Sequence, residues 1–119
     1  MKRALRFAFA VACIASPLAH AHAFLDHAAP AVGSTVRAPP AQIRLWFTQA
    51  LEPAFSTVRV VDRANQRIDR GDAKVDSADA RTLQVSVPTL APGRYRVMWR
   101  VLSVDTHVTE GDFTFDVAP

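Results

Sequence analysis

A histidine and an aspartate near the end of the chain have the spacing of metal ligands. Asp105 and His107 are two residues apart in Ser103-Val104-Asp105-Thr106-His107. In extended backbone successive side chains alternate, so these two are expected to project from the same side and present one oxygen and one nitrogen donor. An Asp and a His near a turn are more often solvated than bound to metal, so the pair indicates a metal site only if a further donor comes near.

Proteolytic processing could supply that donor. Met1 to Arg6 is basic, Phe7 to Leu18 is mostly apolar, and Ala19-His20-Ala21 provides the small residues that a signal peptidase accepts. This order is typical of a secretory signal peptide, and the apolar run is shorter than the roughly 20 residues of a membrane-spanning helix. We therefore predict a signal peptide over 1–21. A cut after Ala23 fits the same A-x-A rule, and composition does not choose between the two.

A chain cut after Ala21 begins with His22. Its α-amine and its imidazole Nδ1 can bind one cation together in a small chelate ring. With His107 and Asp105 the set contains nitrogen and oxygen donors only, and a tetragonal N,O set favours Cu(II). The alternative is that His22 is simply where the peptidase cuts. The Asp-x-His pair and the lack of thiols in the mature chain favour the metal site.

Removing the signal peptide changes what the composition implies. Lys2, Arg3 and Arg6 equal the whole excess of 14 basic over 11 acidic side chains, so the remaining chain is formally neutral. The basic pI of the full chain therefore gives no indication of a nucleic-acid partner or an anionic membrane partner. The single cysteine, Cys13, lies in the signal peptide, which excludes thiolate-bound zinc, iron–sulfur and blue-copper sites from the rest. We expect one monomeric domain over 22–119 that does not insert into the membrane.

Apolar residues in the mature chain alternate with a period of two between turn residues, which predicts an all-β fold. With the N-terminal segment, the runs give about seven strands, typical of a Greek-key β-sandwich or barrel of the immunoglobulin-like (E-set or cupredoxin-like) kind. The polar segment 63–79 fits either a ragged strand pair or a long connection. No helix, Gly-rich phosphate loop or H-E-x-x-H motif is evident. The alternating runs are 42–48, 56–62, 81–87, 94–104 and 112–117.

Four segments carry a family resemblance: His22-Ala23-Phe24-Leu25, Trp99-Arg100-Val101, Ser103-Val104-Asp105-Thr106-His107 and Gly111-Asp112-Phe113-Thr114-Phe115. They resemble the CopC family of periplasmic copper-binding proteins. The resemblance implies a Greek-key β-barrel or sandwich of about seven strands. It also implies that the mature chain starts at His22 and that His22, Asp105 and His107 hold Cu(II).

The chain departs from the family pattern in two places. Some members carry a Met-rich loop for Cu(I), but Met98 is the only methionine here after the signal peptide, so we predict no Cu(I) site. Thr106 stands where the family usually has glycine, which puts a β-branched residue between two expected ligands. His27 and Asp26 are further polar residues near the mature start, and are either auxiliary ligands or solvated surface.

The leading hypothesis is a periplasmic Cu(II) carrier or buffer in copper resistance or uptake, rather than an enzyme. The resemblance suggests an inner-membrane copper permease of the CopD type as partner. One alternative is a copper monooxygenase, because its histidine brace also combines an N-terminal His with a second His. Against it, the chain is short and Asp105 would fill a position that oxygen chemistry needs open. A metal-free immunoglobulin-like adhesion or assembly module is expected if Phe24 begins the mature chain.

Overall fold

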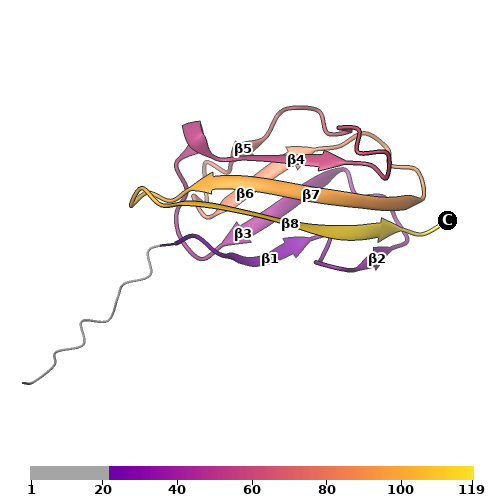
Figure 1. The fold of residues 1–119 in the computed structure, drawn as a ribbon, viewed down its shortest axis with the longest axis horizontal. Coiled ribbons are helices and arrows are strands. Elements are labelled where there is room, and N and C mark those ends of the chain that lie inside the picture. Colours follow the sequence, from indigo (N-terminus) through magenta and orange to yellow (C-terminus); the bar gives the residue numbers. More distant parts are fainter. Residues whose placement is uncertain (1–21) are drawn as a thin grey trace, which may run out of the picture.

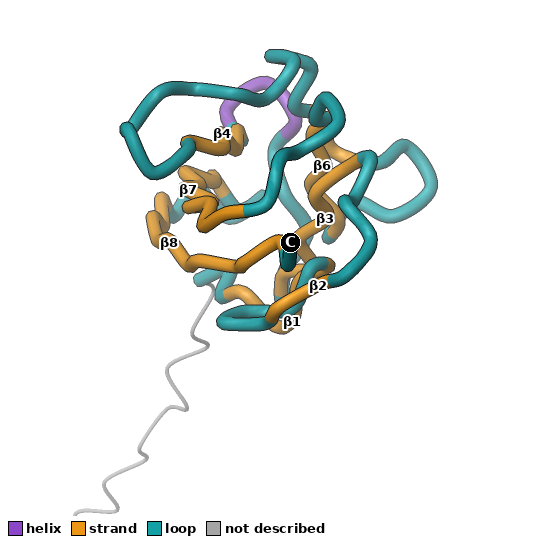
Figure 2. Tube along the Cα trace, turned by 90° about the vertical axis from the view of Figure 1, so that its right-hand side faces the viewer, coloured by secondary structure: helices purple, strands orange, loops and turns teal. Residues whose placement is uncertain are grey.

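Two four-stranded β-sheets pack face to face in the computed structural model, which describes residues 22–119 (Figure 1). Figure 2 shows the two layers end-on, with β4, β7 and β8 on one side and β3 and β6 on the other. The first sheet has the order β1-β3-β6-β5, with β1 at Leu25–Ala29, β3 at Gln42–Phe47, β6 at Thr82–Ser86 and β5 at Lys74–Val75. The second has the order β2-β8-β7-β4, with β2 at Thr35–Val36, β8 at Val108–Val117, β7 at Gly93–Leu102 and β4 at Thr57–Val61.

The predicted all-β sandwich is confirmed. The described residues form eight strands, two of which are only two residues long, and one 3-10 turn, η1 (Pro53–Phe55). No helix within residues 22–119 is long and apolar enough to cross a membrane. The predicted signal peptide over 1–21 lies outside the described residues.

The core lies between the sheets because alternate residues of each strand point inward. In β3 every second residue is buried, and β4 and β6 follow the same alternation except for two adjacent buried residues at one end of each strand. Each buried aliphatic or aromatic side chain contributes about 1.5–3 kcal/mol to stability. The largest side chains with almost no exposed surface are Phe115, Ile43, Leu45, Leu51 and Leu83, with a set of valines around them.

The longest paired segment is the antiparallel hairpin of β7 and β8, in which each strand has 10 residues. Its register places Gly111 opposite Trp99. The indole of Trp99 lies directly over Gly111, so that a Cβ there would be 2.2 Å from the ring. The same indole packs edge-on against Phe47 at 6.0 Å and joins the two sheets. Glycine is required at 111 because the ring fills the space of a side chain.

The polar segment 63–79 is mainly a long connection, with β5 as a short strand at its end. Asp69 organises it from a position where its side chain has 0% exposed surface. Its carboxylate accepts hydrogen bonds from the Val60 and Gly71 amides at 2.9 Å and pairs with the Arg67 guanidinium at 2.9 Å. Burial opposes ionisation, but these hydrogen bonds, that of Arg67 first, hold the pKa of Asp69 below its ordinary value.

We expect Gly111→Ala to lower the free energy of unfolding by about 1–3 kcal/mol, because the new methyl group must displace the Trp99 ring. Denaturant unfolding measures the loss of stability, and the emission maximum of tryptophan fluorescence reports the displacement of the Trp99 ring. In the Trp99→Leu background the same change should cost clearly less, since the obstructing ring is gone. Equal costs in both backgrounds would refute the contact.

Asp69→Asn should lower the free energy of unfolding by about 1–3 kcal/mol near neutral pH, because a buried charge-assisted network loses its acceptor. The depressed pKa makes this stabilisation fully present above the unfolded value of about 3.9, and it is lost as pH falls through the lower folded pKa. Thermal unfolding of the unmodified chain and of Asp69→Asn from pH 7 down to pH 2 should therefore show a difference in unfolding temperature that becomes smaller in acid. Asp112→Asn is the control, since Asp112 pairs with Arg96 at 3.5 Å on the surface and should matter little. A difference that stays constant with pH would contradict this role of Asp69.

Candidate metal centre

The turn between β7 and β8 is closed by Ser103, which is fully buried. The Ser103 amide donates to the His107 carbonyl at 3.0 Å, and the Thr106 amide donates to the Ser103 carbonyl at 2.9 Å. The Ser103 hydroxyl also donates to Asp105 Oδ1. Thr106 completes the turn with a φ of 76°, in the left-handed region that favours glycine. The turn therefore has a defined shape although its outer side chains are exposed.

The structure brings Asp105 and His107 together, but not for the predicted reason. The expectation of extended backbone is wrong, because 104–106 is a turn. The left-handed Thr106 reverses the chain, and Asp105 Oδ1 lies 3.5 Å from His107 Nδ1. The hydrogen bond from the Ser103 hydroxyl, helped by His107, lowers the pKa of Asp105. The carboxylate is therefore ionised at neutral pH and available to a cation.

The segment 22–24 reaches this turn from the other end of the chain. In Figure 1 the start of the described chain lies at the same end of the sandwich as the turn between β7 and β8. Ala23 has 0% exposed surface, and its carbonyl accepts a hydrogen bond of 2.7 Å from the Thr109 hydroxyl. The Phe24 amide donates to the Thr48 hydroxyl at 3.0 Å. These contacts set the His22 ring edge-on to the His107 ring, with centroids 4.6 Å apart.

The three predicted ligands thus meet as two pairs that share His107. No group of three or more His, Cys, Asp or Glu side chains within residues 22–119 is close enough together to hold a metal ion. The donors are imidazole nitrogen and carboxylate oxygen, without sulfur, which suits Cu(II) better than a soft monovalent ion. An additional nitrogen, the α-amine of His22, exists only in a chain that begins there. The donor chemistry therefore fits copper, and a chain that begins at His22 would add this fourth donor.

His27 and Asp26 lie outside this cluster. The His27 ring stacks on Trp46 at 4.4 Å with an interplanar angle of 7°, and its Nδ1 lies 2.7 Å from Asp26 Oδ2. More than half of each of the two polar side chains is exposed. The pair sits at an irregularity in β1, where the register with β3 shifts between Leu25 and His27. These contacts support the solvated-surface alternative rather than auxiliary ligands.

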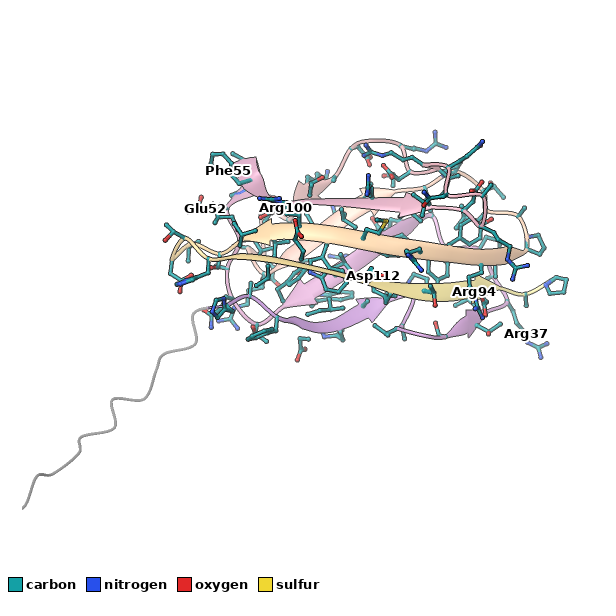
Figure 3. All side chains as sticks on the ribbon, in the orientation of Figure 1. Arg37, Glu52, Phe55, Arg94, Arg100 and Asp112 are labelled. Atoms are coloured by element: carbon teal, nitrogen blue, oxygen red, sulfur yellow. The ribbon has the colours of Figure 1, made fainter. Side chains whose placement is uncertain are left out.

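A groove of about 640 Å³ on the outer face of the second sheet is separate from this cluster. It is lined by outward side chains of β4, β7 and β8, including Arg59, Met98 and Arg100. Figure 3 labels Arg100 and Asp112 on this face, and Arg100 pairs with Glu110 at 3.0 Å. None of the three predicted ligands lines the groove.

Thr48 and Thr109 were not predicted to take part in the site, although their hydroxyl groups hold segment 22–24 in place. Neither residue belongs to a ligand motif, and threonine is common in strands for reasons unrelated to a site. Thr109 gave a weak signal of a role near the site, because it lies two residues after His107 and therefore close to the 103–107 turn. Only the paired sheets show that it faces Ala23.

Comparisons with known proteins agree with this architecture. The model of the CopC domain matches residues 25–118. Protein YobA of Escherichia coli K12 is 38% identical over 118 residues, covering 97% of this chain and 95% of that protein. Copper resistance protein C of Pseudomonas syringae pv. tomato is 36% identical over 115 residues, covering 92% and 90%. The crystal structure of CopC from Methylosinus trichosporium OB3b superposes with a TM-score of 0.77 at 38% identity, over 82% of this chain and 95% of that one. Sequence and fold together show that the chain belongs to the CopC family.

Proposed function

We propose that this protein is a periplasmic Cu(II) carrier or buffer. The metal would be held by the α-amine and imidazole of His22, the Asp105 carboxylate and the His107 imidazole. The observation that carries the proposal is the contact of the His22 and His107 rings at 4.6 Å, between residues from opposite ends of the domain. Relatives named copper resistance proteins support copper as the cargo.

The packing of Ala23 supports a cut after Ala21. Ala23 is completely buried and its carbonyl is bonded to Thr109. A cut after Ala23 would remove this residue and leave its site in the core empty, whereas a cut after Ala21 keeps the hydrogen bonds of segment 22–24 with Thr48 and Thr109. Signal peptide removal would then both release the protein into the periplasm and create the amine ligand.

The exposure of the ligands favours a carrier over an enzyme. The side chains of His107 and Asp105 are 49% and 37% exposed, so ligands of a second protein can approach the ion while the first ones leave. An exposed site of this kind suits stepwise ligand exchange. An inner-membrane copper permease of the CopD type is the partner that we propose, for copper resistance or for uptake, with this protein acting as a monomer.

The α-amine is the ligand that a short extension removes. We expect a mature chain with one added alanine before His22 to bind Cu(II) at least about 100-fold more weakly, or about 3 kcal/mol, because its nitrogen becomes an amide and the chelate ring is lost. Competition titration with a colorimetric chelator measures the difference. His27→Ala, which removes an exposed histidine outside the cluster, should bind as the unmodified chain does. Equal binding by the extended and unextended chains would sink the proposal.

Affinity for Cu(II) should weaken as pH is lowered, because protons compete with the metal for the nitrogen ligands. The amine has a reference pKa of about 7.7–8.0, so each pH unit below that value should weaken Cu(II) binding about tenfold. Asp105, whose pKa is lowered, stays ionised throughout this range. Titrations at pH 8, 7 and 6 should therefore show Asp105→Asn weaker at every pH but with the same slope. A change of slope in this variant would contradict the assignment.

A further inference from the structure

The first three described residues are held from both sheets of the sandwich. From the second sheet, the Thr109 hydroxyl in β8 donates to the Ala23 carbonyl at 2.7 Å. From the end of β3 in the first sheet, Thr48 accepts from the Phe24 amide at 3.0 Å, and its own amide donates to the Phe24 carbonyl at 2.9 Å. The Thr48 hydroxyl also donates to the His22 carbonyl at 3.4 Å. The main chain of segment 22–24 is thus fixed before any metal binds.

This fixation matters because a chain terminus is ordinarily poorly ordered. The amine and imidazole of His22 can chelate copper in any conformation of the terminus. Asp105 and His107, however, reach the same ion only if the His22 backbone is held beside their turn. Holding two parts of a site together beforehand removes the entropic cost of bringing them together at binding.

Thr109 is better placed than Thr48 to act in this way. It lies two residues after His107 at the start of β8, so its hydroxyl ties Ala23 to the same strand that leaves the ligand turn. Its bond is also the shorter one, and Thr109 is half-buried whereas Thr48 is exposed. Thr109 therefore links segment 22–24 directly to the strand that follows the 103–107 turn, whereas Thr48 links it to the end of β3.

We infer that Thr109, assisted by Thr48, is a positioning residue of the copper site: it joins the chelate of His22 to the ligands of the 103–107 turn. This inference rests on the proposed function. The hydroxyl need not touch the metal, and its effect should appear only when both halves of the ligand set are present.

The test is a double-mutant cycle on the mature chain, with Cu(II) as the probe. Thr109→Val keeps the shape and removes the hydroxyl, and it should weaken Cu(II) binding about tenfold. The same change in the Asp105→Ala/His107→Ala background should leave the residual affinity unaltered, since the remaining chelate is local. Thr109→Ser should restore binding. Thr114→Val, on the same strand and without a side-chain hydrogen bond among the described residues, is the matched control.

A metal-free measurement separates positioning from general stability. In the apo protein the ¹⁵N order parameters of the Ala23 and Phe24 amides should fall from about 0.85 towards 0.6 in Thr109→Val, with the rest of β8 unchanged.

In the copper-loaded protein, the Cu(II) electron paramagnetic resonance spectrum of Thr109→Val should shift towards that of the His107→Ala variant. If Thr109→Val lowers stability too far, Thr48→Val should show the same changes in smaller size.

Equal weakening in both ligand backgrounds would overturn the inference, because Thr109 would then support only the fold. Unchanged affinity in Thr109→Val would overturn it as well. Both outcomes differ from failure of the proposed function, in which the alanine extension before His22 leaves Cu(II) binding unaltered.

Discussion

The antiparallel register of β7 and β8 is the constraint on which the other parts of the structure depend. It pairs Leu102 with Val108, so that the chain must reverse between them and Asp105 and His107 share one tight turn. It also places Trp99 over Gly111, where the indole packs against Phe47 of the first sheet. A shift of one residue would turn every side chain of β8 to the opposite face. Core and ligand turn are therefore fixed by the same pairing.

Much of the fold could be predicted from alternating apolar residues, and the exceptions have physical causes. The predicted run 42–48 corresponds to β3, and 81–87 corresponds to β6. The prediction began the last strand at Asp112, whereas β8 begins at Val108. The difference arises because Thr109 and Gly111 interrupt the apolar pattern: Thr109 uses its inward position for a hydrogen bond and Gly111 for contact with a ring.

The candidate site was only partly visible in the sequence. Asp105 and His107 could be paired because they are neighbours, and His22 could be added through the chemistry of a free amine. The contacts that unite them could not be predicted, since a hydroxyl that bonds a backbone carbonyl leaves no pattern in a sequence. The left-handed backbone conformation of Thr106 was not predicted either, because glycine, rather than a β-branched residue, is the usual sign of that conformation.

The irregularity in β1 has a consequence for how this chain meets its own copies. β1 is an edge strand of the first sheet, and an edge strand exposes backbone groups to which another chain can add a strand. Between Leu25 and His27 the pairing with β3 shifts, and the charged Asp26 occupies the same place. A bulge with a charge on it leaves no straight row of donors and acceptors. The irregularity thereby protects β1, the strand that follows segment 22–24, against aggregation through its free edge.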